Sequence, residues 1–123
     1  MKNTQIGIVA MVALLLFVGC SSNKIGSLDN RWSKDTCGCS RIRDTKLADK
    51  LLKDYQLMNN TKVAFLNVFG EPDTIKESDG SEVLVYYWGT VCSNNKIIKE
   101  SDRCYADFYF KDDKLISNSF PCE

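Results

Sequence analysis

An apolar stretch at the N-terminus is the feature that most limits what this chain can fold into. It runs from Ile6 to Gly19 and follows a basic start at Lys2. A membrane-spanning helix needs about 20 apolar residues, and this stretch is shorter. A basic start before a short apolar run is typical of a secretory signal peptide. We therefore expect residues 1–19 to direct export, which leaves residues 20–123 to fold outside the cytoplasm.

A lipid attachment signal follows directly. The sequence Leu16-Phe-Val-Gly-Cys-Ser-Ser22 resembles the lipobox, at which bacteria attach diacylglycerol to a cysteine and then cleave the chain before it. Gly19 is small enough to admit the peptidase, and Cys20 carries the only thiol in the first 36 residues. We expect Cys20 to be lipidated and to hold the protein on a membrane through acyl chains such as palmitate. The alternative is an uncleaved N-terminal anchor with an incidental cysteine.

The length and charge of the remaining chain indicate one domain without a nucleic-acid partner. Acidic and basic residues balance at 16 each, and no run of like charge marks a surface for nucleic acid. The segment from Ser21 to about Asp35 is polar apart from Trp32 and has no periodicity. We divide the chain into a signal peptide (1–19), a lipidated tether (20–36) and a small domain (37–123), and Trp32 is expected to dock on the domain or on a partner.

Five further cysteines follow Cys20, and disulfides are the expected use for them because an exported protein meets an oxidising compartment. Cys92 and Cys104 flank an 11-residue polar loop at the ends of two strand patterns. Residues so placed can face each other across an antiparallel pair, so we expect a bridge between them. Cys122 would then bond either Cys37 or Cys39, which leaves one thiol over.

Two other uses of the cysteines remain open. A four-cysteine zinc site is disfavoured because the chain has no histidine and no Cys-x-x-Cys pair. The Cys37-Gly-Cys39 pair could bond to itself, and so small a ring would be strained and easily reduced, as in a redox pair. Structural bridges are the preferred interpretation.

Hydrophobic spacing predicts two helices. The first covers residues 45–56, with Asp44 or Thr45 as its N-cap and apolar side chains at Leu47, Ala48, Leu51, Leu52 and Tyr55. The second covers residues 61–69 and is apolar over most of its surface, so we expect it to be buried. Gly70 and Pro72 end it.

The sequence after the second helix, from residue 74 onward, predicts an antiparallel sheet. Long strands are expected at 83–88, 104–110 and 114–120, with residues 74–76 as a candidate short strand before an Asp79-Gly80 turn. A Cys92–Cys104 bridge would place Trp88 opposite Phe108 and Tyr86 opposite Phe110. We therefore expect an α+β domain in which two N-terminal helices pack on a three-stranded antiparallel sheet, in the order α-α-β-β-β.

Residues 59–120 resemble the small outer-membrane lipoprotein A family, which includes the E subunit of the bacterial β-barrel assembly machinery. The pattern is a threonine cap, three apolar positions and Gly-x-Pro, taken here by Thr61, Phe65, Val68, Phe69, Gly70 and Pro72. The resemblance implies a fold shared with β-lactamase-inhibitor proteins. It also implies a lipoprotein of the outer membrane, facing the periplasm, that binds assembly lipoproteins or barrel proteins. Ser21 after the lipid cysteine resembles the outer-membrane sorting pattern of enteric-type bacteria.

The expected function is a non-catalytic binding module, acting as an accessory subunit in outer-membrane β-barrel assembly or in envelope integrity. The alternative is an inhibitor of a periplasmic or secreted enzyme. An inhibitor needs an exposed aromatic patch, for which the candidates are Tyr86, Tyr87, Trp88, Tyr105 and Tyr109.

Catalysis is not expected. Without histidine there is no Ser-His or Cys-His pair, and no glycine-rich phosphate loop follows a strand. The carboxylate pairs Asp112-Asp113 and Asp49-Asp54 fall in a turn and on a solvated helix face. We assign no catalytic residue, no cofactor and no metal site.

Overall fold

The computed structural model describes residues 27–98 and 103–122, which form an α+β domain. Its helical elements are a 3-10 turn η1 (Thr36–Gly38) and two helices, α1 (Thr45–Asp54) and α2 (Lys62–Phe69). The strands are β1 (Thr74–Ser78), β2 (Ser81–Trp88), β3 (Cys92–Ser93), β4 (Lys96–Ile97), β5 (Cys104–Lys111) and β6 (Lys114–Ser119). Within the described ranges, no helix is long and apolar enough to cross a membrane.

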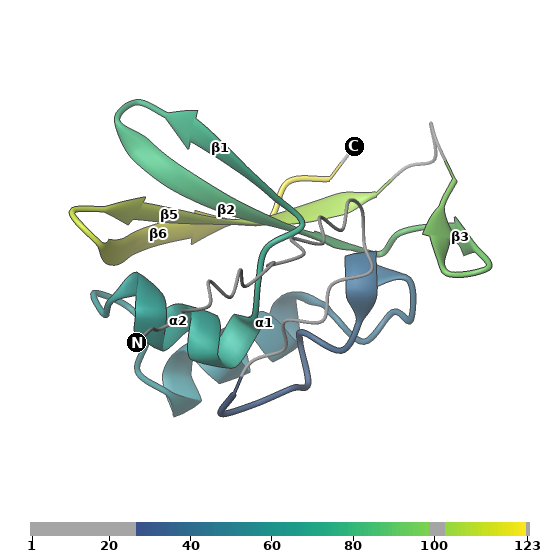
Figure 1. Cartoon of the computed structure of the whole chain (residues 1–123), viewed down its shortest axis with the longest axis horizontal. Coiled ribbons are helices and arrows are strands. Elements are labelled where there is room, and N and C mark those ends of the chain that lie inside the picture. The colour runs from purple at the N-terminus through teal and green to yellow at the C-terminus, as the bar shows by residue number, and fades with distance from the viewer. Residues whose placement is uncertain (1–26, 99–102, 123) are drawn as a thin grey trace, which may run out of the picture.

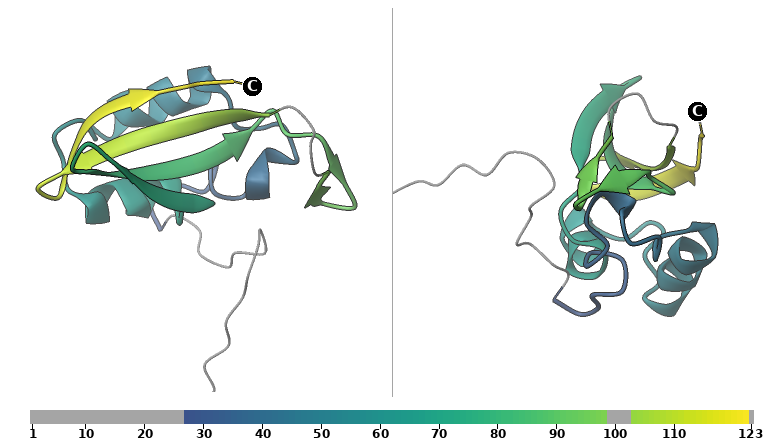
Figure 2. Two further views of the ribbon diagram at one scale, coloured as in Figure 1. Left: turned by 90° about the horizontal axis from the view of Figure 1, so that it is seen from above. Right: turned by 90° about the vertical axis from the view of Figure 1, so that its right-hand side faces the viewer.

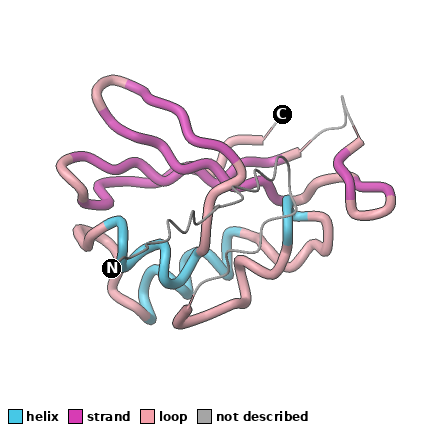
Figure 3. Tube along the Cα trace, in the orientation of Figure 1, coloured by secondary structure: helices cyan, strands magenta, loops and turns pink. Residues whose placement is uncertain are grey.

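The main sheet is antiparallel with the strand order β1-β2-β5-β6, and β3 and β4 form a separate hairpin that projects beyond its end (Figure 1). Both helices lie on one face of the sheet, as Figures 2 and 3 show. The β1–β2 hairpin and the C-terminal residues rise on the opposite side (Figure 1). In the part of the chain that the structure describes, a helical layer therefore covers one face of the sheet and none covers the other.

The prediction of a three-stranded sheet is wrong, because the sheet has four strands. The additional strand is β1, which pairs with β2 along its whole length, from Thr74 opposite Val85 to Ser78 opposite Ser81. It is an edge strand with Ile75 as its only large apolar residue, so its sequence carries little of the alternation by which strands are recognised. The Asp79-Gly80 turn that joins it to β2 was expected and is present.

All three hairpins use a two-residue turn in which both residues have positive φ. These pairs are Asp79-Gly80 (49° and 80°), Asn94-Asn95 (53° and 62°) and Asp112-Asp113 (52° and 66°). Such turns match the right-handed twist of the flanking strands, and asparagine, aspartate and glycine tolerate the conformation best. The local turn chemistry thus fixes each hairpin.

The helix caps follow the sequence prediction. The Asp44 carboxylate accepts a hydrogen bond from the Leu47 N–H, and the Thr61 hydroxyl accepts one from the Ala64 N–H. Gly70 ends α2 with a φ of 74°, a conformation that favours glycine. Helix α1 ends at Asp54, two residues before the predicted end, because Gln56 already has a positive φ of 51°.

An aromatic core joins the helices to the sheet. Trp32, Phe65, Phe69, Tyr86 and Phe108 are all 0 % exposed, and the ring centroids of Trp32 and Phe69 lie 5.1 Å apart. Trp32 therefore docks on the domain. Since Trp32 lies in the segment predicted as tether, the folded unit begins before the predicted boundary at residue 37.

The pairing between β2 and β5 differs from the prediction by four residues. Trp88 lies opposite Cys104 and Tyr86 opposite Ala106, where Phe108 and Phe110 were expected. Side chains alternate between faces with a period of two, so a shift of four residues keeps each on its predicted face. The apolar face was predicted correctly, and only its register was wrong.

The two disulfides whose partners both lie among the described residues join Cys39 to Cys92 and Cys104 to Cys122. The predicted bridge between Cys92 and Cys104 is therefore wrong, and so is the predicted bond from Cys122 to Cys37 or Cys39. Gly89, with a φ of 60°, turns the chain away from the sheet after β2, so Cys92 reaches η1. Cys104 instead faces the returning C-terminal segment, where the Tyr105 N–H donates to the Pro121 carbonyl. Among the described residues no cysteine is free.

Candidate functional site

The sheet face opposite the helices, here called the helix-free face, is the first candidate for a binding surface. Strand alternation places Val83, Val85 and Asp107 on it, and these side chains are 0, 4 and 4 % exposed. A face without a helical layer would ordinarily carry solvated side chains. Burial of these three residues shows that larger neighbours on the same face enclose them.

A hollow of about 410 Å³ opens on this face, and we call it the Asp107 hollow. Thr74, Val85 and Asp107 form one row across β1, β2 and β5, and Tyr87 and Tyr105 form another pair across β2 and β5. The complete lining is Thr74, Lys76, Val85, Tyr87, Tyr105, Asp107 and Pro121. Three strands and the C-terminal segment therefore build the hollow together.

The carboxyl group of Asp107 has an unusual environment. Its Oδ2 atom lies 3.8 Å from the Lys76 Nζ atom, and its buried Oδ1 atom has no hydrogen-bond partner in the described structure. Burial raises the pKa of this carboxyl group, and the charge of Lys76 opposes that rise in part. An unsatisfied buried acceptor costs about 1–3 kcal/mol, so the fold holds this carboxyl group in place at a cost in stability.

Two tyrosines line the hollow beside this carboxyl group. The ring centroids of Tyr87 and Tyr105 lie 5.7 Å apart at an interplanar angle of 76°, an edge-to-face arrangement. The guanidinium carbon of Arg103 lies 5.5 Å from the Tyr87 ring centroid. Burial, and then the charge of Asp73, raise the pKa of the Tyr87 hydroxyl. The hollow thus combines aromatic surface with one buried carboxyl group.

A buried ion pair holds the Tyr87 backbone in place. Arg43 donates to the Asp73 carboxylate at 2.8 Å, to the Tyr87 carbonyl at 3.0 Å and, through Nε, to the Trp32 carbonyl at 2.9 Å. Asp73 in turn accepts a hydrogen bond from the Tyr87 N–H at 2.8 Å. Because Tyr87 is fixed on both sides of its peptide unit, the wall of the hollow that it forms is rigid.

The structure separates the predicted aromatic patch into two groups. Tyr86 is 0 % exposed and therefore unavailable to a partner, and Trp88 is half-buried with its ring packed against the core. Tyr87, Tyr105 and Tyr109 lie on the helix-free face, and the first two line the hollow. The sequence analysis missed Asp107, whose only signal is a carboxylate at an outward position inside an aromatic strand.

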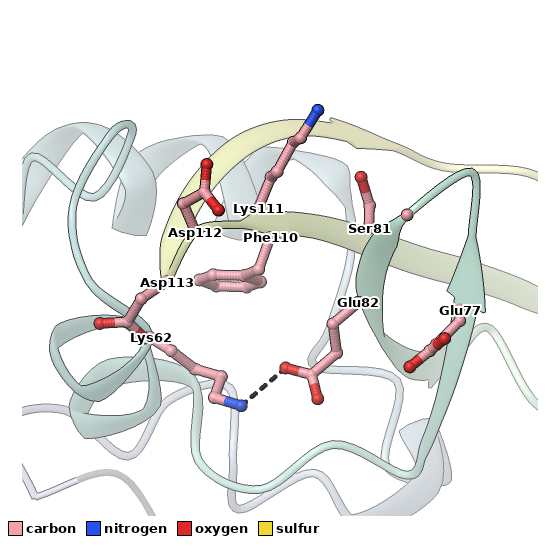
Figure 4. A pocket seen from close by; sticks show the side chains of 9 residues that line it. Lys62, Glu77, Ser81, Glu82, Phe110, Lys111, Asp112 and Asp113 are labelled. Carbon is pink, nitrogen blue, oxygen red and sulfur yellow. Dashed lines mark hydrogen bonds and ion pairs between the residues drawn. The ribbon is translucent and has the colours of Figure 1, made fainter.

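A second hollow, of about 340 Å³, lies near the tips of the hairpins and is mainly charged (Figure 4). Lys62 and Glu82 form an ion pair of 2.6 Å across it, and Lys111 points away from them. Its lining is Lys62, Glu77, Gly80, Ser81, Glu82, Phe110, Lys111, Asp112 and Asp113. Within residues 27–98 and 103–122, no three cysteine or carboxylate side chains are arranged to hold a metal ion. This hollow is an ordinary solvated surface.

Cys20, the predicted lipidation residue, lies outside the described residues. Cys37 and Cys39 do not bond to each other, because Cys39 bonds Cys92. No protein-family model, no curated protein and no solved structure matches the chain.

Proposed function

We propose that this protein is a lipid-anchored, non-catalytic binding module of the bacterial cell envelope. Cys20 carries the anchor, and the helix-free face receives the partner. The observation that carries the proposal is the Asp107 hollow, where a buried carboxyl group with an unsatisfied oxygen lies beside two tyrosines on a face that neither described helix covers. Pockets of this kind, apolar with a few convergent polar groups, are the usual form of binding sites.

The composition of the hollow favours binding over catalysis. Asp107 and Lys76 are the charged residues of its described lining. They form an ion pair with 3.8 Å between the Oδ2 and Nζ atoms. Acid–base catalysis needs an acid and a base that act on one substrate, whereas here the carboxylate and the ammonium face each other as a pair. A fixed carboxyl group and fixed aromatic rings are sufficient for recognition.

The proposed location is the outer membrane, with the domain facing the periplasm. A specific candidate for the role is an accessory subunit in β-barrel assembly or envelope integrity, with assembly lipoproteins or a barrel protein as partners. The support is the resemblance in α2, whose Thr61 cap and Gly70 stop have the backbone geometry that the motif requires.

Site-specific crosslinking in living cells tests the binding face. A photoreactive phenylalanine replaces Tyr105 in the hollow or, as the control, the exposed Asp112 at a hairpin tip. We expect products from position 105 that position 112 does not give, and mass spectrometry identifies them. Barrel assembly further predicts that deletion of the protein lowers several outer-membrane barrels together. Equal products from both positions would contradict the proposed face.

A second candidate function is inhibition of a periplasmic enzyme, and the β3–β4 hairpin favours it. This hairpin projects from the domain (Figure 1), is fixed by the Cys39–Cys92 bridge, and exposes Val91 and Ile98 at 41 and 44 %. A stapled hairpin with exposed apolar residues has the rigidity that tight inhibitors use. An inhibitor should form a soluble complex with one enzyme even after Cys20→Ser substitution, and absence of such a complex would exclude this function.

A further inference from the structure

The polar groups of the Asp107 hollow require a ligand that both donates and accepts hydrogen bonds. Asp107 lines the hollow, and the 3.8 Å from its Oδ2 atom to Lys76 Nζ is too long for a hydrogen bond. The Lys76 side chain is 57 % exposed, so its ammonium group can also turn to a ligand. A hydroxyl group donates once and accepts twice. Two neighbouring hydroxyl groups on one ligand can therefore donate to the Asp107 carboxylate and accept from the Lys76 ammonium at the same time.

The charges around the hollow disfavour a cationic ligand. Among the described residues, Lys76 lies 3.8 Å from the Asp107 carboxylate and Arg103 lies over the Tyr87 ring, so two positive groups stand against one carboxylate of the lining. Asp73, whose charge also acts on Tyr87, is already paired with Arg43 at 2.8 Å. A lysine or arginine side chain from a partner would bring a third positive charge. A neutral or anionic ligand fits without that repulsion.

The remaining lining is apolar and needs a ligand with an apolar surface of its own. Val85, Pro121 and the rings of Tyr87 and Tyr105 form most of the walls. Tyrosine presents a flat apolar ring with a polar tip, which suits ligands that are polar at the rim and apolar on the face. A pyranose ring has this form, because its hydroxyls project around the edge and its C–H groups cover the faces.

We propose that the Asp107 hollow binds a glycan, with a pyranose ring against Tyr87 and Tyr105 and with its hydroxyls bonded to Asp107 and Lys76. This inference rests on the proposed function and names the class of its partner. A membrane-anchored module with this specificity would tie the membrane to a saccharide of the cell envelope, a role in envelope integrity rather than in barrel folding.

The first experiment titrates oligosaccharides into the purified full-length protein in detergent micelles and follows backbone amides by NMR. The probes are tetrasaccharides of N-acetylglucosamine, of β-linked glucose and of galacturonic acid, each to about 10 mM, which detects a millimolar dissociation constant. We expect at least one to shift the amides of residues 74–76, 85–87 and 105–107. N-acetyl-arginine amide serves as the cationic comparison and should leave these amides unchanged.

Matched variants separate binding from folding. Asp107→Asn should weaken the responding saccharide at least tenfold without lowering the melting temperature, because the variant removes a buried charge. Tyr105→Leu should weaken binding to a similar extent. Tyr109→Leu changes a tyrosine on the same strand and face that does not line the hollow, and it should bind as the unmodified protein does.

Three outcomes would overturn the glycan inference. They are no amide shift with any saccharide, shifts that map to other residues, and equal binding by the Asp107→Asn variant. The crosslinking experiment distinguishes this failure from that of the proposed function. If position 105 captures an identified envelope protein while no saccharide binds, the binding module stands and only its ligand class is wrong. If neither is found, both proposals fail.

Discussion

Arg43 and Asp73 form an ion pair of 2.8 Å in which the two side chains are only 3 and 9 % exposed. Arg43 precedes α1, and Asp73 immediately precedes β1, so the pair ties the segment before the helices to the sheet. Arg43 also lies over the Trp32 ring at 5.3 Å. A single side chain thus connects the core tryptophan, the edge of the sheet and the backbone of Tyr87.

We predict that breaking this pair destabilises the whole domain. Removing one partner of a buried ion pair leaves an uncompensated charge and typically costs about 3–5 kcal/mol. Asp73→Ala should therefore lower the free energy of unfolding by about 3 kcal/mol or more, measured by chemical denaturation. The control is Lys62→Met, which breaks a more exposed pair worth about 1 kcal/mol at most. Equal losses for both variants would show that burial does not set the contribution of the Arg43–Asp73 pair.

Gly38 should tolerate no side chain. It has a φ of 73°, and a Cβ atom there would lie 2.5 Å from both the Trp88 Cα and the Tyr87 carbonyl oxygen. Gly80→Ala is the matched control, because Gly80 has a φ of 80° and open space around its Cβ position. Positive φ alone costs an alanine about 1–2 kcal/mol, and the clash should add about 1–3 kcal/mol. Thermal unfolding of the two variants measures this difference, and a Gly38→Ala variant as stable as Gly80→Ala would contradict the close approach.

The two bridges with described partners should differ in their contribution to stability. In the chain-entropy treatment, closing 53 residues through Cys39–Cys92 is worth about 4 kcal/mol, and closing 18 residues through Cys104–Cys122 about 3 kcal/mol. Replacing each pair by serine and measuring unfolding without reductant tests the order. Peptide mapping under non-reducing conditions checks the connectivity itself. A peptide linked through Cys92 and Cys104 would contradict the structure.

Asp107 should make the free energy of unfolding depend on pH in the direction opposite to that expected for a salt-bridged carboxylate. Its pKa in the folded chain is raised above 3.8, so the folded state holds the proton more tightly than the unfolded state. Its contribution to stability is therefore greatest at low pH and falls as pH rises from 3.8 through the raised value. The difference in unfolding free energy between the unmodified protein and Asp107→Asn should fall over this window and then level off.

Asp29 provides the comparison of opposite sign. Hydrogen bonding to Arg31 lowers the pKa of its carboxyl group to about 2. Its stabilising contribution is therefore complete above 3.8 and is lost as pH falls toward about 2. In the same pH series, the unfolding free energy of the Asp29→Asn variant should lack this loss of stability at acid pH.

For Asp107, a contribution to the unfolding free energy that rises with increasing pH would contradict the environment described for that residue.

The local sequence determined the elements that depend on neighbouring residues. Asp44 and Thr61 cap the helices, Gly70 ends α2, and Asp79-Gly80 turns a hairpin, as predicted. Period-two alternation also assigned Tyr86, Trp88, Phe108 and Phe110 to one apolar face. These features follow from hydrogen bonds and φ preferences within a few residues, so they can be predicted without knowledge of the fold.

Tertiary structure decided what depends on residues far apart in the chain. The fourth strand forms because β2 offers it a partner, although residues 74–78 carry almost no apolar pattern. The disulfide connectivity follows from where Gly89 and the C-terminal segment turn, and a count of cysteines cannot give it. Asp107 stands out only once Val85 and Tyr105 surround it, because burial is a property of packed neighbours and a sequence pattern records only the period along one strand.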